Sequence, residues 1–154
     1  MALVYLGLGT NLGDKMRNLN DALSLLAMEV GEVLCQSSFY ESKPNGFESE
    51  NDFLNAAVLV ETSLSPFDLL AKTQMLESQL GRATSRAKIY VDRIIDIDIL
   101  MYENRIINQP ALKIPHPLFA ERDFVLIPMA EIAPEMVHPL LGKTMLELKF
   151  RLTI

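Results

Sequence analysis

Two aspartates at alternate positions, Asp96 and Asp98, are the residues of this chain whose spacing most directly suggests chemistry. They interrupt an apolar, β-branched run from Ile94 to Tyr102, a pattern that predicts a strand with both carboxylates on one face, roughly 7 Å apart. Two like charges side by side on such a strand are destabilising unless a cation, an arginine or water lies over them. Mg²⁺ suits this arrangement, because it takes one or two protein carboxylates and completes its shell with water and phosphates. We therefore expect a metal and phosphate site, with a solvated strand face as the alternative.

Basic side chains gather just before this strand, in the segment 82–93. Four of the fourteen lysines and arginines are found there, namely Arg82, Arg86, Lys88 and Arg93. A polyphosphate site needs cations that neutralise the phosphates next to carboxylates that hold a metal. A solvated charged loop is the alternative, and the neighbouring aspartate pair favours the phosphate site.

The composition indicates one globular domain over residues 1–154, because 49% of the residues are hydrophobic and the length allows a substantial core. The net charge of −6 argues against a nucleic-acid partner, since phosphate-backbone binding needs a basic surface. No apolar run approaches the ~18 residues of a membrane span and no signal peptide is evident, so we expect a cytoplasmic protein without a membrane partner. The one cysteine, Cys35, is expected to be a small buried residue.

Hydrophobic periodicity predicts the elements that must position these side chains. Strand-like alternation and helix-like spacing follow one another along the first two thirds of the chain. The expected elements are strands at 2–9, 32–40, 52–62 and 94–102, and helices at 14–29 and 67–80. Their order, βαββαβ, is that of a ferredoxin-like α+β fold, an antiparallel sheet with helices packed on it. We expect the first and fourth strands to lie side by side in the middle of this sheet, which would place Asp96 and Asp98 centrally.

The last third of the chain is expected to form a C-terminal extension. A short strand at 106–107 would close a hairpin with the acidic strand, and a helix over 120–132 would be divided in two by Pro128. Residues 146–152 fit a last short helix or a strand. Between these elements His116 lies between Pro115 and Pro117, where a stiff backbone suits a positioned side chain, although a lone histidine is often structural.

Short motifs with fixed spacings occur along nearly the whole chain, namely Tyr5-Leu6-Gly7-Leu8-Gly9-Thr10-Asn11-Leu12-Gly13, Ser37-Ser38-Phe39-Tyr40, Phe53-Leu54-Asn55-Ala56-Ala57, Glu77-x-x-x-Gly81-Arg82, Arg93-x-x-Asp96-Ile97-Asp98-Ile99-Leu100, Pro115-His116-Pro117 and Arg122-x-Phe124-Val125-Leu126-x-Pro128-Met129. In combination they resemble one family, the 6-hydroxymethyl-7,8-dihydropterin pyrophosphokinases. The Arg-x-x-Asp-x-Asp stretch followed by Pro-His is the most specific part of this combination.

The resemblance implies an ATP-dependent diphosphokinase of folate biosynthesis that uses two Mg²⁺ ions and releases AMP. It implies catalytic roles for Arg82, Arg93, Asp96 and Asp98, with the two aspartates as the metal ligands. The residues implied to bind ATP are Glu77, Arg82, Arg93, Ile99, His116 and Arg122. Those implied to bind the pterin, a flat heterocycle with a donor and acceptor edge, are Ser42, Lys43, Asn45, Gly46, Phe53, Asn55 and Phe124.

The residues themselves leave plainer interpretations open for part of this set. Phe53 and Phe124 could be core packing, and Glu77 could be a solvated acid on a helix surface. Asn55 lies in a largely apolar strand, where it is either a structural hydrogen-bonding residue or a reader of a ligand.

The sequence departs from the family pattern at four positions. Phe53 stands where a tyrosine is frequent, and Thr84 where a second arginine is expected. Tyr90 and Asp92 replace a tryptophan and a proline in a loop one residue longer than usual. These differences bear on affinity more than on the reaction.

Two other functions are compatible with part of the pattern. One is a different metal-dependent nucleotide-using transferase, which would need the aspartate pair but not the pterin residues. The other is a ferredoxin-like regulatory module without catalysis, which would have no reason to combine Arg82, Arg93, the aspartate pair and His116. We expect a monomer, because no oversized apolar stripe is visible.

Overall fold

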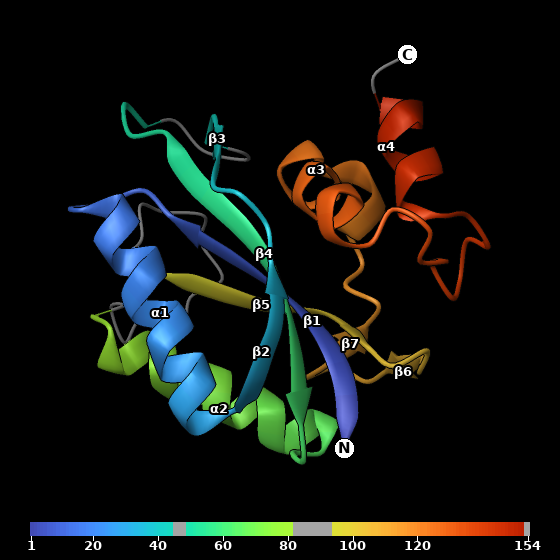
Figure 1. Ribbon diagram of the computed structural model, residues 1–154, viewed down its shortest axis with the longest axis horizontal. Coiled ribbons are helices and arrows are strands. Elements are labelled where there is room, and N and C mark those ends of the chain that lie inside the picture. Colours follow the sequence, from blue (N-terminus) through green and yellow to red (C-terminus); the bar gives the residue numbers. More distant parts are fainter. Residues whose placement is uncertain (45–48, 82–93, 153–154) are drawn as a thin grey trace.

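A computed structural model describes residues 1–44, 49–81 and 94–152 of the chain (Figure 1). In order, the elements are β1 (Ala2–Thr10), α1 (Lys15–Glu29), β2 (Gly31–Gln36), β3 (Tyr40–Ser42), β4 (Phe53–Thr62), α2 (Pro66–Gln79), β5 (Asp96–Tyr102), β6 (Ile107–Asn108), β7 (Lys113–Ile114), a 3₁₀ turn (Phe119–Glu121), α3 (Asp123–Ile132) and α4 (Met145–Leu152). None of the helices in these ranges is long and apolar enough to cross a bilayer.

The main sheet is antiparallel and has the order β2-β4-β1-β5, with β3 added to β4. The predicted ferredoxin-like α+β fold is therefore confirmed, as is the pairing of the first strand with the acidic strand. The expected central position of the acidic strand is wrong, because β5 ends this strand order and β1 and β4 occupy the middle. Consequently one backbone edge of β5 is available to other elements.

Helices cover both faces of the sheet (Figure 1). On one face α1 and α2 pack against alternate residues of β1, β4 and β5, including Leu6, Val58 and Ile97. On the other face α3 and α4 pack over the opposite side chains, such as Ala57 and Leu100.

The helices begin and end where local chemistry predicts. Asp14 caps α1 by accepting a hydrogen bond from the Arg17 N–H at 3.1 Å, and Ser65 caps α2 in the same way through the Asp68 N–H at 3.3 Å. Pro66 occupies the first position of α2, where its missing N–H costs nothing. After α2, Gly81 has a positive φ of 102°, which a residue with a side chain rarely adopts.

The predicted strand at 32–40 is divided in two. Gln36 lies opposite Val58 and Tyr40 lies opposite Asn55, so the connection between β2 and β3 contains three residues, 37–39, where β4 has two. This bulge is held by Ser37, whose Oγ accepts from the Ala57 N–H at 2.9 Å. Further along β2, Cys35 is exposed, so the prediction of a buried cysteine is wrong.

Two predictions for the C-terminal extension are also wrong in detail. The short strand β6 pairs with β7 rather than closing a hairpin with β5. The helical stretch is interrupted at Arg122, whose backbone is extended, and Pro128 lies within the continuous helix α3. A proline here removes one backbone donor, and the burial of neighbouring Leu126 and Met129 maintains the helix despite that loss. The last segment, α4, is a helix, one of the two predicted alternatives.

Candidate active site

Asp96 and Asp98 lie on one face of β5, as their spacing predicts, and both are half-buried. Each is directly opposite a glycine of β1, Asp96 opposite Gly9 and Asp98 opposite Gly7. Because opposite residues of antiparallel strands point to the same side, the glycines leave space beside the carboxylates. Two carboxylates suit Mg²⁺, which would take its other ligands from water and phosphate, and no group of three potential metal ligands occurs within residues 1–44, 49–81 and 94–152.

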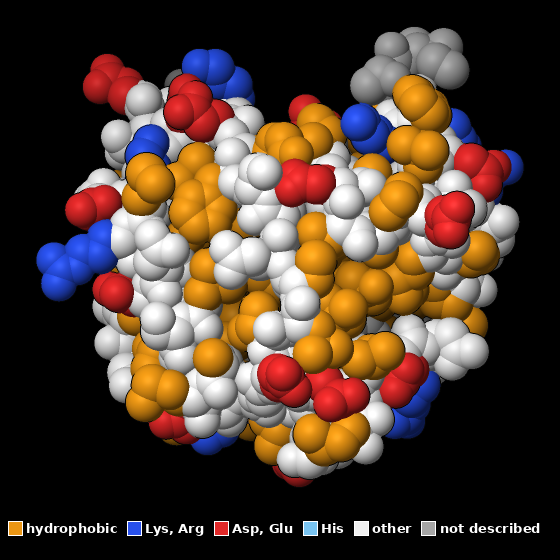
Figure 2. Space-filling model, in the orientation of Figure 1, with side chains coloured by type: hydrophobic (Ala, Val, Ile, Leu, Met, Phe, Trp, Pro, Cys, Tyr) orange, Lys and Arg blue, Asp and Glu red, His pale blue; other side chains and the backbone are white. Residues whose placement is uncertain are grey.

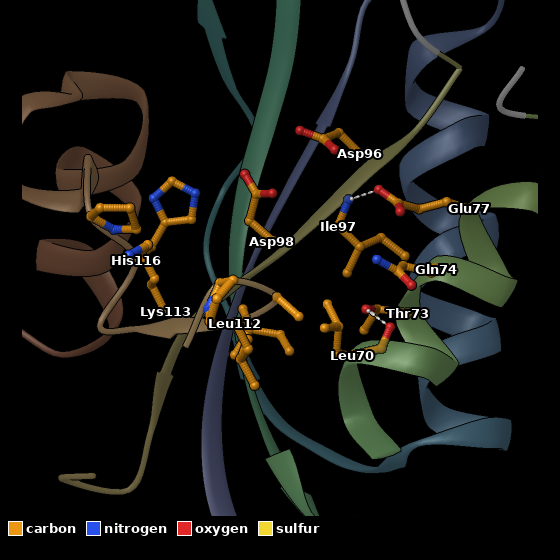
Figure 3. A pocket seen from close by; sticks show the side chains of 14 residues that line it. Leu70, Thr73, Gln74, Glu77, Asp96, Ile97, Asp98, Leu112, Lys113 and His116 are labelled. Carbon is orange, nitrogen blue, oxygen red and sulfur yellow. Dashed lines mark hydrogen bonds between the residues drawn. The ribbon is translucent and has the colours of Figure 1, made fainter. Parts of the chain in front are cut away.

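A cavity of about 430 Å³ lies beside β5, between α2 and the segment 110–117 (Figure 3). Asp96 and Asp98 stand at its rim, with Glu77 on the α2 side and His116 on the opposite side, nearer to Asp98. Ile99 also contributes to the lining. The volume is within the usual range for a small-molecule site. The structure therefore brings together five of the residues implied to bind metal or ATP: Glu77, Asp96, Asp98, Ile99 and His116.

Glu77 is not a solvated surface acid, so that alternative is wrong. Its side chain is 4% exposed, and its Oε2 accepts a hydrogen bond from the Ile97 N–H at 2.9 Å. The Ile97 amide belongs to the strand at the end of the sheet order, so Glu77 supplies the acceptor that another strand would otherwise supply. Glu77 thus fixes α2 against the strand that carries both aspartates.

His116 is positioned by hydrogen bonds at both its backbone and its ring. Its N–H donates to the Leu100 carbonyl at 3.0 Å, and its Nδ1 accepts from the Leu118 N–H at 3.2 Å. Burial lowers the pKa of His116, the positive charge of Arg122 lowers it further, and the charge of Asp96 acts in the opposite direction. The ring is therefore neutral at pH 7, and a neutral ring that accepts at Nδ1 carries its proton on Nε2.

Asn55 on β4 is buried and organises the second group of predicted residues. Its Nδ2 donates to the Tyr40 carbonyl at 3.0 Å and to Ser42 Oγ at 2.8 Å. Both hydrogens of the amide nitrogen are thus used for structure, so Asn55 would bind a ligand through its oxygen. The structural alternative for Asn55 is confirmed, and it leaves a role as a hydrogen-bond acceptor open.

The two groups of site residues are connected across the sheet. Tyr40, Asn55, Gly9 and Asp96 form one cross-strand row, on β3, β4, β1 and β5 in turn. Asn55 and Asp96 are therefore two strand spacings apart, about 10 Å. Gly9 lies between them, and a Cβ there would come within 3.3 Å of Asn55 Oδ1 and 3.6 Å of Phe53 Cδ1. The floor between the two groups is bare backbone because this position is glycine.

Arg122 and Phe124 form a further contact beside the sheet. The Arg122 guanidinium carbon lies 5.4 Å from the centre of the Phe124 ring, a cation–π distance. Both side chains are half-buried, Arg122 directly before α3 and Phe124 in its first turn. Phe124 is therefore not simply a residue of the closed core.

Other predicted residues are placed elsewhere or are not described. Lys43 is exposed and forms an ion pair with Asp52, at 3.1 Å between Nζ and Oδ2. The predicted roles of Asn45, Gly46, Arg82 and Arg93, and the departures at positions 84, 90 and 92, lie outside the described residues.

Sequence reasoning missed part of the cavity lining, namely Leu70, Thr73, Gln74, Leu112 and Lys113. For Thr73 and Gln74 a signal was present, because they precede Glu77 by four and three residues and so share its helix face. For Leu112 and Lys113 there was none, since an irregular segment has no periodicity.

Two half-buried aspartates beside a cavity, on a ferredoxin-like α+β fold, form an arrangement that could hold a metal-bound phosphate group. The family model described as "7,8-dihydro-6-hydroxymethylpterin-pyrophosphokinase (HPPK)" matches residues 5–134. The chain belongs to this family, and it is a diphosphokinase.

Individual relatives agree with this assignment. The chain is 47% identical over 141 residues to a 2-amino-4-hydroxy-6-hydroxymethyldihydropteridine pyrophosphokinase of Porphyromonas gingivalis, covering 90% of this chain and 95% of the relative. It is 43% identical over 149 residues to the protein of the same name from Aquifex aeolicus, covering 97% and 91% of the two.

The fold recurs in a solved structure of much lower sequence similarity. A Plasmodium falciparum HPPK-DHPS crystal structure with pteroate matches with a TM-score of 0.82 at 17% identity, covering 97% of this chain. This chain spans 44% of that longer protein. The family assignment decides against a regulatory module without catalysis and against an unrelated nucleotide-using transferase.

Proposed function

We propose that Asp96, Asp98 and His116 bind ATP and magnesium in this chain. We also propose that Asn55, with Phe53 and Phe124, binds the second substrate. The reaction follows from the family: a pyrophosphoryl group is transferred to the hydroxymethyl group of 6-hydroxymethyl-7,8-dihydropterin, in folate synthesis. The observation that carries the proposal is the cross-strand row from Asn55 to Asp96, which places the residue proposed to bind the heterocycle in line with one proposed to hold the metal.

The aspartates are proposed to hold two Mg²⁺ ions, which when bound neutralise charge on the triphosphate of ATP. The proposal is supported by the oxygen-only donor pair, its half-buried setting and the adjacent cavity. His116, neutral and protonated on Nε2, can donate a hydrogen bond to a phosphate oxygen. Arg82 and Arg93 are proposed to meet the charge that develops on the transferred group.

In the transfer, the hydroxyl oxygen of the pterin bonds to the β-phosphorus of ATP. The bond between that phosphorus and the oxygen bridging to the α-phosphorus breaks, so AMP leaves and the hydroxyl proton passes to solvent. The protein's contribution is alignment, because in-line attack needs both substrates held in one geometry. The acceptor oxygen of Asn55, with the aromatic faces of Phe53 and Phe124, is proposed to hold the pterin ring, and the backbone of Asn55 lies about 10 Å from that of Asp96, two strand spacings away.

A single copy of the sequence supplies every residue in this proposal, which supports a monomer as the working unit. The test is AMP release from ATP and Mg²⁺, with and without 6-hydroxymethyl-7,8-dihydropterin, for the wild type and for Asp96→Asn and Asp98→Asn. We expect pterin-dependent AMP release that falls at least about 100-fold in both variants, as when a charged group that stabilises a transition state is removed. Wild-type activity retained in both variants would contradict the metal assignment.

A further inference from the structure

Glu131, near the end of α3, connects that helix to the start of β3. Its Oε1 accepts a hydrogen bond from the Ser38 N–H at 2.6 Å, and its Oε2 accepts from the Tyr40 hydroxyl at 2.7 Å. These partners are more than 90 residues away in sequence. One carboxylate therefore fixes the position of the strand beginning at Tyr40 relative to the helix.

The position of Tyr40 determines that of Asn55. The Tyr40 carbonyl is one of the two acceptors that orient the Asn55 amide, and the two residues are directly opposite each other in the β3–β4 ladder. A displacement of Tyr40 would therefore rotate the amide of Asn55, and with it the oxygen that faces a ligand.

The proposed pterin site has two walls, Asn55 on β4 and Phe124 on α3, and α3 is the helix that carries Glu131. Phe124 is in the first turn of α3 and Glu131 is near its end, seven positions further along a helix that is continuous through Pro128. Because a helix is stiff over two turns, fixing its last turn to β3 also restricts where the Phe124 ring lies relative to Asn55.

The protonation states agree with this role. The Ser38 amide lowers the pKa of Glu131, while the hydrogen bond to Glu131 raises the pKa of Tyr40. The carboxylate is therefore ionised and the phenol is protonated at neutral pH. Because Glu131 and Ser38 are exposed, these bonds add little to the stability of the whole fold.

We infer that Glu131 is a positioning residue for the pterin substrate, which it serves by fixing the distance between the Phe124 wall and the Asn55 wall without touching the ligand. This inference rests on the proposed function. Under this inference Glu131 affects the affinity for the pterin. It does not affect the affinity for ATP, because the cavity proposed to bind ATP lies beside β5 and is not lined by Glu131.

The experiment compares Glu131→Ala, Glu131→Gln and a matched control, Glu135→Ala, which removes another exposed acid a few residues further along. The readouts are KM for 6-hydroxymethyl-7,8-dihydropterin, KM for ATP, kcat and the urea midpoint of unfolding. We expect Glu131→Ala to raise the pterin KM about tenfold, with the ATP KM within about twofold and the urea midpoint close to wild type. Glu131→Gln, which keeps an acceptor for Ser38, should restore most of the pterin affinity.

Two results with Glu131→Ala would overturn the inference, and one result with the wild type would overturn the proposed function. Equal pterin KM values for Glu131→Ala and Glu135→Ala would show that Glu131 has no positioning role. A parallel rise of both KM values with a lower urea midpoint would show a general structural role. If the wild type releases no pterin-dependent AMP, the proposed function itself fails.

Should Glu131→Ala not fold, Tyr40→Phe removes only the hydrogen bond between the Tyr40 hydroxyl and Glu131. An unchanged pterin KM in that variant would also overturn the inference.

Discussion

Glu77 carries a carboxylate that the fold has almost completely removed from water, and its partner is a backbone amide of the strand that ends the sheet order. Glu77→Ala would leave that buried amide without this acceptor and open a space in the interface of α2 with β5. We expect a loss of about 2 kcal/mol in the free energy of unfolding, the usual cost of an unsatisfied buried group. Urea denaturation measures it.

Glu77→Gln is the matched control, because glutamine keeps an acceptor oxygen in nearly the same volume. It should lose clearly less stability than Glu77→Ala. Equal stability of the alanine variant and the wild type would show that the Ile97 amide finds another acceptor. The proposal that Glu77 stabilises the contact of α2 with β5 would then be wrong.

His138 provides a pH dependence of stability that is independent of the substrates. It is buried, its Nδ1 accepts from the Leu140 and Leu141 N–H groups, each at 3.2 Å, and its ring meets Phe119 edge to face. Burial lowers the pKa of His138 in the folded chain. Below pH about 6.5 the unfolded chain thus binds a proton that the folded chain resists, so folding stability decreases as pH falls from there towards the folded pKa.

The measurement is the urea midpoint between pH 7.5 and 5 for the wild type and for His138→Asn, whose side-chain oxygen can accept the same two amides. His116 contributes a slope of the same sign in both proteins, since burial lowers its pKa too. We therefore expect a shallower but not flat pH dependence in His138→Asn. Identical slopes in the two proteins would contradict the assignment.

Among individual residues, the sequence predicted those whose role follows from local spacing. Asp96 and Asp98 were found because alternation alone puts them on one face. Glu131 could not be found in this way, because its partners are more than 90 residues distant and no local pattern relates the two segments. His138 has no periodic context, and its role depends on a loop conformation.

Among the elements, β1 is the strand that makes room for the site. Its two glycines on the site face, Gly7 and Gly9, lie opposite the two aspartates. We expect Gly9→Ala to raise the pterin KM roughly tenfold, because the new methyl would come within 3.3 Å of Asn55 Oδ1 and displace it. Steady-state kinetics with each substrate varied in turn measures this effect.

Gly7→Ala is the control on the same strand and face. Its methyl would meet the Leu100 side chain at 3.4 Å, an ordinary van der Waals contact distance, and it would not reach Asn55, so the pterin KM should change by less than about twofold. If Gly9→Ala binds the pterin as well as Gly7→Ala does, the row from Asn55 to Asp96 does not form the floor of the substrate site.

The elements predicted correctly are those with long, regular hydrophobic periods, namely β1, α1, β4, α2 and β5. The pairing of β6 with β7 was missed because strands of two residues have no period to detect. The position of β5 at the end of the strand order was missed for another reason: one face of β5 is apolar whether the strand is central or at an edge. The hydrogen bond from the Ile97 N–H to Glu77, made in place of one to a further strand, distinguishes an edge strand from a central one here.

In the whole molecule, the cavity lies along the strand that ends the sheet order, between α2 and the segment 110–117. Figure 2 shows acidic side chains distributed around one face rather than gathered in a patch, and lysines and arginines of the described residues are likewise scattered there. Two carboxylates, Asp96 and Asp98, stand side by side along β5, where they are proposed to hold a small, metal-bound, polyphosphate substrate.

Ligand binding at such a site should be measurable as stability of the whole fold, because a ligand that binds only the folded chain stabilises it. At a concentration 100 times its Kd, a non-hydrolysable ATP analogue with Mg²⁺ contributes about 2.7 kcal/mol. For a chain of this length that corresponds to a rise in Tm of roughly 5–10 °C, which EDTA should largely reverse. Asp98→Asn should lose the part of this rise that depends on Mg²⁺, whereas Asp21→Asn, which removes an exposed acid on α1 with equal change in charge, should keep it. A magnesium-dependent rise in Tm that persists in Asp98→Asn would place the metal elsewhere, and with it the phosphates that the aspartate pair is proposed to hold.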